Sequence, residues 1–378
     1  MITLSRRFRH VVYALPVCML LWIFISLLAL ESAHKPIETK WFPLMYMNIN
    51  RSGMYDSVND NFIHSFNKDS ASCRFTAIAD RDKKPVDLRL IVITYARPKS
   101  LVRLIKSLDR ALYGQSNVML EVWIDRSKTH DVHAETLYAL QNVSFHQGRC
   151  NVIVHPFHVG IRGQWLSTWN PEPDSSEIAV ILEDDLTVSP HFYTYLKMAH
   201  SKYQHRRDIY GFTLQGASVR HSDGSCCLNV PQENKVFLYP TLGTSGFSPK
   251  RDHWIKFQEW LKYVLVGDVH IPLIDDHVSS LWYKELSKTG KEDSMWEMEY
   301  LFYATSMKQY TLYPNFDQLG FAFNWFEDGL HSKGESITDV NEERKKIVLR
   351  FNVTINDLPD SPVIVDNNGD IVLVEGAL

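Results

Sequence analysis

Several features that would assign this 378-residue sequence to a familiar class are missing. The formal net charge is -4, so the basic excess typical of nucleic-acid-binding proteins is absent. The sequence shows no internal repeat, no low-complexity tract and no glycine-rich phosphate loop. Its five cysteines lack the CxxC spacing of structural zinc sites. What remains is a chain with 45% hydrophobic residues, enough for one large domain or two small ones.

An uncharged apolar run covers residues 11–30, close to the roughly 20 residues that a helix needs to cross a bilayer. Three arginines precede this run and Glu31 follows it, so the positive-inside rule places residues 1–10 in the cytosol. We therefore expect a single-pass type II protein of the Golgi or ER membrane, with the remainder of the chain in the lumen. The alternative is a cleaved signal peptide, whose apolar region is usually shorter.

An oxidising lumen would allow disulfide bonds among the four cysteines beyond the apolar run. These cysteines can pair in three ways, and buried free thiols are the alternative. They are Cys73, Cys150, Cys226 and Cys227. Three N-x-S/T sequons, at Asn50, Asn142 and Asn352, also suit a luminal protein.

The chain is expected to begin its folded domain at residue 87, after a stem or lead-in over residues 31–86 that shows no sustained hydrophobic period. From there, continuous apolar runs alternate with helical patterns, which predicts an α/β fold with parallel strand pairing. Ligands of such sheets bind beyond the carboxyl ends of the strands. The polar residues that follow the predicted strands are Thr94 and Arg97, then Asp125, and finally Glu183 to Asp185.

From about residue 208 the sequence pattern changes to short strand-like segments and aromatic helices. We interpret residues 208–331 as an acceptor-side half. The preceding residues, 87–207, form the nucleotide half in this interpretation. A C-terminal extension, residues 332–378, ends in two apolar runs that flank NNGD, which predicts a hairpin.

Three adjacent acids, Glu183, Asp184 and Asp185, follow the apolar run IAVIL. Their mutual repulsion near a low-dielectric core favours a bound cation, and carboxylate oxygens suit hard ions such as Mn²⁺ or Mg²⁺. The alternative is a solvated acidic turn at the start of a helix.

ILEDDL resembles the acidic DxD-type motif, in its EDD form, of GT-A-fold glycosyltransferases of the family 2-like type. It is most similar to the form seen in the N-acetylglucosaminyltransferase that initiates complex N-glycans. LIVITYARPKSLVRLIKSL and GIRGQWLSTW are similar to segments that precede this motif in the same family. The resemblance covers residues 87–331 and implies a GT-A-type, Rossmann-like mixed sheet flanked by helices.

The resemblance further implies that Asp185 ligates the metal, while Glu183 and Asp184 contact the donor or metal-bound water. Thr94, Arg97 and Asp125 would line the nucleotide pocket, with Arg162 and Trp165 near the donor. The donor is expected to be a nucleotide sugar, with UDP-sugars favoured. For Arg162 a surface ion pair is the alternative, and for Trp165 a core position.

An inverting transferase also needs a carboxylate that acts as general base on the acceptor hydroxyl. The candidates are Asp276, beside Asp275, and Glu297, beside Glu299; relatives commonly place the base in such an aromatic-rich helix, and we prefer Glu297. His331 matches the position of a histidine that supplies another metal ligand in many GT-A sites, although an ordinary surface or core histidine is the alternative.

The sequence thus predicts a metal-dependent glycosyltransferase that acts on a glycan, glycoprotein or glycolipid acceptor. One alternative is a membrane-anchored GT-A-like protein that has lost turnover and serves binding or adhesion. A metal-dependent phosphoester hydrolase is a second alternative, although such enzymes usually spread their acids over several motifs.

Overall fold

The computed structural model describes residues 73–78, 86–216, 220, 222, 224, 228–267, 271–317, 319–325 and 347–372. Among these residues no helix is long and apolar enough to cross a membrane, and the predicted anchor, residues 11–30, lies outside them. The C-terminal turns of helix α8, residues 260–266, and the following residue 267 belong to a separate compact unit. The account below concerns residues 73–259 and 271–372.

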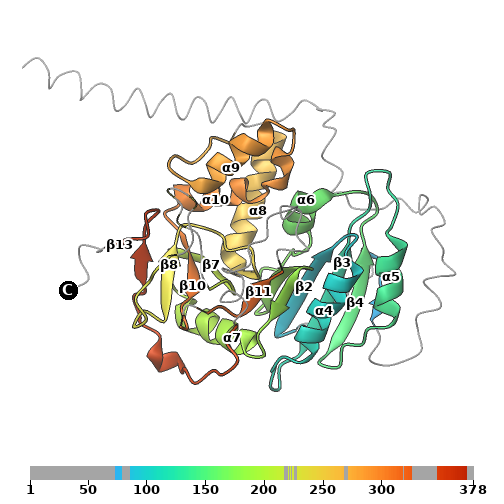
Figure 1. Cartoon of the computed structure of the whole chain (residues 1–378), viewed down its shortest axis with the longest axis horizontal. Coiled ribbons are helices and arrows are strands. Elements are labelled where there is room, and N and C mark those ends of the chain that lie inside the picture. Colours follow the sequence, from blue (N-terminus) through green and yellow to red (C-terminus); the bar gives the residue numbers. More distant parts are fainter. Residues whose placement is uncertain are drawn as a thin grey trace, which may run out of the picture. The chain divides into compact units, whose positions relative to one another are not determined.

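The first part of the chain alternates strands and helices (Figure 1). Its elements are β1 (Arg74–Phe75), β2 (Leu88–Thr94), α4 (Pro98–Asp109), β3 (Val118–Ile124), α5 (Ala134–Gln141), β4 (Arg149–Val154), α6 (Gly160–Ser167), β5 (Ile178–Glu183), β6 (Leu186–Val188) and α7 (Phe192–Tyr203).

The second part contains shorter strands and a group of helices. Its elements are β7 (Ile209–Thr213), β8 (Val236–Tyr239), β9 (Phe247–Pro249), α8 (Arg251–Val266), α9 (Val278–Ser287), η3 (Glu292–Ser294), α10 (Glu297–Ser306), β10 (Tyr310–Pro314), β11 (Ala322–Asn324), η5 (Ile355–Asp357), β12 (Val363–Val365) and β13 (Ile371–Val372).

Eleven strands of the described residues form one sheet, in the order β1-β4-β3-β2-β5-β9-β7-β10-β8-β12-β13. Pairing is parallel from β1 to β5, as the alternation of strands and helices predicts. Beyond β5 the three-residue strand β9 lies antiparallel to both of its neighbours, so the sheet is mixed. The α/β class and the mixed sheet are therefore confirmed. A separate two-stranded sheet pairs β6 with β11.

The central strands are buried on both faces, which explains their continuous apolar sequences. One face packs against α4, whose Leu101, Leu104 and Leu108 are fully buried, and Pro98 begins this helix in the first-turn position that proline tolerates. On the other face, Arg89 of β2 forms buried ion pairs with Glu121 and Glu177. A buried charge needs such partners because its desolvation would otherwise be costly.

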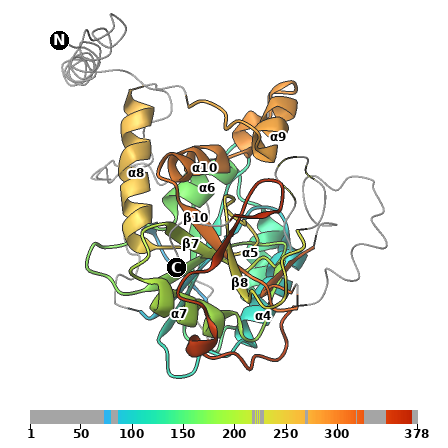
Figure 2. The same cartoon turned by 90° about the vertical axis from the view of Figure 1, so that its left-hand side faces the viewer.

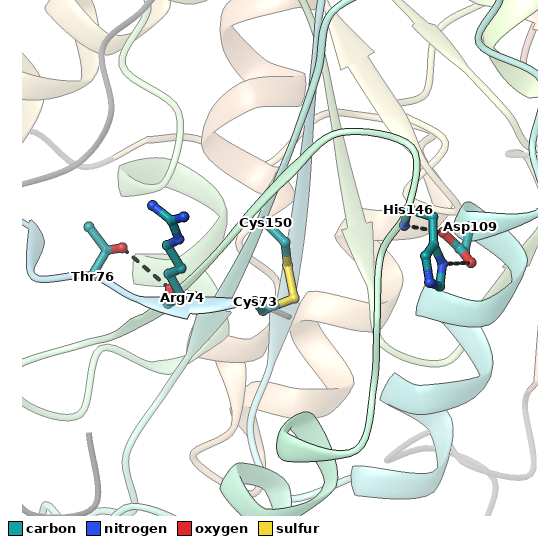
Figure 3. The surroundings of a disulfide bond; sticks show 6 residues. All are labelled: Cys73, Arg74, Thr76, Asp109, His146 and Cys150. Carbon is teal, nitrogen blue, oxygen red and sulfur yellow. Dashed lines mark hydrogen bonds and ion pairs between the residues drawn. A yellow bond between two sulfur atoms is a disulfide. The ribbon is translucent and has the colours of Figure 1, made fainter. Parts of the chain in front are cut away.

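Both segments that flank the predicted domain contribute strands to the sheet. Strand β1, in the predicted stem, pairs with β4, and β12 and β13, in the predicted C-terminal extension, pair antiparallel as the NNGD signal predicts. Cys73 is disulfide-bonded to Cys150 of β4, next to the hydrogen bonds between His146 and Asp109 (Figure 3). The boundaries at residues 87 and 331 stay predictions.

Replacing Cys73 or Cys150 by serine should lower the free energy of unfolding by about 2–4 kcal/mol, because the disulfide restricts the unfolded chain. Chemical denaturation of the purified protein measures the loss. The double variant Cys73→Ser with Cys150→Ser should lose no more than either single variant, since both remove the same bond. Losses that add in the double variant would contradict the pairing.

Candidate active site

The candidate site lies where two neighbouring parallel strands, β2 and β5, end. Ile93 of β2 is in register with Glu183 of β5, so the loop after β2 lies beside the acidic triplet. The chain runs outward from β2 through β3 to β4 and then returns to β5 on the other side of β2. Such a reversal of strand order leaves a crevice at the carboxyl ends of the strands, the usual ligand site of open α/β sheets.

The end of β2 and the loop after it contact the two aspartates of the triplet. Thr94 donates a hydrogen bond from Oγ1 to Asp184 Oδ2 at 2.6 Å. Arg97 donates from Nη1 to Asp185 Oδ2 at 2.9 Å, and its Nε lies 3.2 Å from Asp184 Oδ1. Asp184 and Asp185 are only 1% and 4% exposed, so their charges are balanced inside the protein rather than by water. Trp325, beyond β11, donates its backbone N–H to the carbonyl of Asp185.

Burial shifts the pKa values of the charged groups in this cluster. It raises the pKa of Asp184 to about 6, although Arg97 and the Thr94 hydroxyl oppose the shift. Burial, followed by the charge of Asp185, also raises the pKa of the half-buried Glu183 well above its usual value. Burial alone would lower the pKa of Arg97, but the charges of Asp184 and Asp185 hold it above its usual value. The site therefore holds more negative charge than one arginine neutralises.

The oxygens of Asp184 and Asp185 fit a hard divalent cation. Within the described residues, no three His, Cys, Asp or Glu side chains are grouped as a ready metal site. Mg²⁺-like ions, however, are usually held by one or two carboxylates together with waters and substrate phosphates. Two buried aspartates match that donor set, and an added cation would share their oxygens with Arg97.

Asp125, at the end of β3, holds the N-terminus of helix α6. Its carboxylate accepts hydrogen bonds from the backbone N–H groups of Val159 and Gly160, both at 2.9 Å, and His158 Nδ1 lies 3.1 Å away. A carboxylate at a helix N-terminus satisfies free N–H groups and complements the helix dipole. The contacts of Asp125 are thus with this chain, whereas the sequence predicts a contact with the nucleotide, and that contact stays a prediction.

Helix α6, drawn close to α10 in Figure 2, also carries Arg162 and Trp165. These two residues contact helix α10 and its preceding residue. Arg162 Nη2 lies 2.7 Å from Glu299 Oε1, so the ion-pair alternative holds for this arginine. Trp165 is fully buried, donates from Nε1 to Glu183 Oε1 at 3.0 Å, and stacks on Trp296 with ring centroids 4.2 Å apart. Neither role excludes a donor contact.

Glu297 is the first residue of α10 and directly follows Trp296. Burial raises the pKa of Glu297 to about 7, and the charge of Glu299 adds to the shift. As a whole, the residue is half-buried. Its neighbour Trp296 stacks on Trp165, which donates to Glu183, so Glu297 directly follows a residue that is linked to the acidic triplet.

Asp276, the second candidate base, is less connected to this site. Asp276 is exposed in the loop before α9, and its backbone carbonyl accepts a hydrogen bond from Asn367 Nδ2. No hydrogen bond or ion pair among the described residues joins Asp276 to the triplet. His331 lies outside the described residues, a few positions after Trp325. Both roles stay predictions.

Three contributors to the site were missed at the level of sequence. Gln164 Nε2 donates to the carbonyl of Thr94, His158 contacts Asp125, and Arg103 lies over the ring of Trp325 at 4.3 Å. The position of His158, just after the third long strand, is a signal that could have been used, because polar residues gather at strand ends. The other two contacts join residues far apart in the chain and leave no local pattern.

No protein-family model matches the sequence, and no curated protein matches it. Residues 1–349 of TarS from S. aureus match 61% of this chain and 60% of that one, with 16% identity and a TM-score of 0.31. The same protein in complex with UDP-GlcNAc matches 51% of this chain and 52% of its own, with 16% identity and a TM-score of 0.29.

A mannosyltransferase from Pyrobaculum calidifontis, in complex with GDP-Man and Mn²⁺, matches 55% of this chain and 54% of its own, with 13% identity and a TM-score of 0.32. The chain thus spans less than two thirds of the length of each of these structures. Similarities with TM-scores of 0.29–0.32 are partial, so the proposal below relies on this chain's own residues.

Replacing Asp125 by alanine should lower the free energy of unfolding by about 1–2 kcal/mol, because two N–H groups of the α6 N-terminus lose their acceptor. Chemical denaturation measures this loss, and Asp131→Ala, at an exposed aspartate in the loop after β3, serves as control. If Asp125→Ala instead weakened nucleotide binding with unchanged stability, Asp125 would be a ligand contact rather than a helix cap.

Proposed function

We propose that this chain is a metal-dependent glycosyltransferase that moves a sugar from a nucleoside diphosphate sugar to an acceptor hydroxyl. The observation that carries the proposal is the pair of buried carboxylates, Asp184 and Asp185, at the end of β5 beside Thr94 and Arg97 from the end of β2. Buried acids at the switch point of an α/β sheet suit the binding of a metal–diphosphate group.

On the donor side, Asp185 would hold a Mn²⁺ or Mg²⁺ ion, and Glu183 and Asp184 would contact the donor or a metal-bound water. When bound, the ion acts as a Lewis acid on the diphosphate oxygens and stabilises the departing nucleoside diphosphate. Thr94 fixes Asp184 through its 2.6 Å hydrogen bond. Arg97 supplies a permanent positive charge beside the same oxygens, which favours an anionic ligand.

On the acceptor side, Glu297 takes the proton of the acceptor hydroxyl. The hydroxyl oxygen bonds to the anomeric carbon of the sugar, and the bond from that carbon to the diphosphate oxygen breaks with its electron pair leaving on the diphosphate. This single displacement inverts the configuration at the anomeric carbon. The buried surroundings of Glu297 support the role, because a base with a pKa near 7 is both available and effective at neutral pH.

The remaining parts of the proposal concern substrates and location. We favour a UDP-sugar as the donor and a glycan, glycoprotein or glycolipid as the acceptor, with His331 as a further metal ligand. The protein is proposed to be a type II membrane protein of the Golgi or ER, anchored by residues 11–30. The disulfide between Cys73 and Cys150 supports an oxidising compartment for the folded domain.

Replacing Asp185 by asparagine should reduce Mn²⁺-dependent hydrolysis of nucleotide sugars by about 100-fold or more, because metal stabilisation of the leaving group is worth several kcal/mol. The assay follows release of UDP or GDP from UDP-GlcNAc, UDP-galactose, UDP-glucose and GDP-mannose. Asp174→Asn, at an exposed acid outside the site, is the matched control. A wild-type protein that neither binds nor hydrolyses these donors would favour the binding or adhesion alternative.

The same hydrolysis should accelerate as the pH rises through about 7, because Glu297 acts as a base only after it loses its proton. Glu297→Gln should lower the rate by about 100-fold or more and remove this pH dependence, since glutamine accepts no proton. Glu299→Gln removes a like charge and should move the midpoint of the rise to lower pH, independently of its effect on the maximal rate. A Glu297→Gln variant with the wild-type pH profile would assign the base elsewhere, with Asp276 next to be tested.

A further inference from the structure

Helix α6 is fixed to the donor side of the site by three polar contacts. The Asp125 carboxylate accepts hydrogen bonds from the backbone at the helix start, Gln164 Nε2 donates to the carbonyl of Thr94 at 3.1 Å, and Trp165 Nε1 donates to Glu183 Oε1 at 3.0 Å. These partners follow or end strands β3, β2 and β5. A short helix that is held at both ends in this way has little freedom to shift against the sheet.

The same helix makes two contacts with the start of α10, and their spacing matches. Arg162 and Trp165 are three residues apart and so lie on one face of α6. Their partners, Glu299 and Trp296, are also three residues apart and are met in reverse order. The two contacts therefore fix both the position and the direction of α10 relative to α6. Glu297 is carried by the same helix start, on a different side from Trp296 and Glu299.

We infer that α6 positions the start of α10, and with it Glu297, relative to the donor side of the site, with Arg162 and Trp165 acting as positioning residues through Glu299 and Trp296. This inference rests on the proposed function. It differs from the sequence-based prediction that Arg162 lies near the donor, because the guanidinium group of Arg162 contacts Glu299 through both Nε and Nη2 at 2.7 Å. A base must sit within hydrogen-bond reach of the acceptor hydroxyl, so small displacements of α10 reduce the rate more than they reduce donor binding.

The decisive experiment compares Arg162→Gln with wild type in two measurements. The first is the dissociation constant of UDP in the presence of MnCl₂, measured by titration calorimetry. The second is kcat for hydrolysis of whichever donor the wild type turns over fastest among UDP-GlcNAc, UDP-galactose, UDP-glucose and GDP-mannose. We expect kcat to fall about 10- to 100-fold while the dissociation constant stays within about twofold.

Arg206→Gln is the matched control, because Arg206 forms a comparable ion pair with Asp208 at 2.6 Å, outside the site. The side chains of Arg206 and Arg162 are 29% and 33% exposed, so the two substitutions remove similar partly buried contacts. Arg206→Gln should leave both kcat and UDP binding unchanged. Thermal unfolding of each variant shows whether the protein remains folded.

Exchange of the two charges provides the second test. Arg162→Glu combined with Glu299→Arg should restore kcat to within about threefold of wild type, because the ion pair is rebuilt with its partners reversed. If Arg162→Gln weakened UDP binding as much as it lowered kcat, and the exchange failed to restore activity, Arg162 would be a donor contact and the inference would be wrong.

The inference and the proposed function fail in different ways. If the wild-type protein neither binds UDP with Mn²⁺ nor hydrolyses any of the four donors, the proposed function is wrong and the inference falls with it. If the wild type is active and Arg162→Gln leaves kcat unchanged, only the inference is wrong. If Arg162→Gln does not fold, kcat and the dissociation constant of UDP are compared instead in Glu299→Gln and in the variant with the two charges exchanged.

Discussion

The structure depends on the pairing of one arginine with two buried aspartates. Asp184 and Asp185 end a strand inside the protein, where their charges are costly unless partners lie close by. Those partners are Thr94, the last residue of the neighbouring strand β2, and Arg97, which follows it. The acidic triplet therefore requires β2 and β5 to be adjacent and parallel, which in turn requires the chain to return from β4 past two strands. The strand order of the sheet and the neutralisation of the buried aspartates therefore depend on each other.

Helix α6 is part of the connection from β4 to β5. Its sequence has a low intrinsic tendency to form a helix. GIRGQWLS contains two glycines, and glycine disfavours helix interiors. Besides the burial of Trp165 and Leu166, the helix is held by Asp125, by Gln164 and by the bond from Trp165 to Glu183, and each of these polar contacts involves a residue at a strand end. Because these contacts are polar and directional, the position of α6 follows the geometry of the site closely. A helix held only by apolar packing would have less orientational precision.

The sequence predicts the sheet well wherever burial leaves a continuous apolar signal. Strands β2, β3 and β5 were expected from such runs, and the polar residues at their ends were expected to converge, as Thr94, Arg97 and the triplet do. Strand β9 was not predicted, because three residues carry no period, and its antiparallel insertion changes the sheet beyond β5. The pair of Arg162 with Glu299 joins residues 137 positions apart, so no local pattern could reveal it. The role of Asp125 as a helix cap was not predicted either, because the segment that forms α6 was not expected to be a helix.

The three acids of the motif are chemically alike but differ in surroundings, and the difference follows from where β5 ends. Glu183 is the last residue of the strand and turns toward Trp165 of α6, on the side that leads to α10. Asp184 and Asp185 form the turn into β6 and face Arg97 on the side of β2. One carboxylate therefore connects the site to the helices, while two concentrate negative charge where a cation can be held. A motif of adjacent acids can in this way contact two different elements, because the strand ends at Glu183 and the chain turns at Asp184 and Asp185.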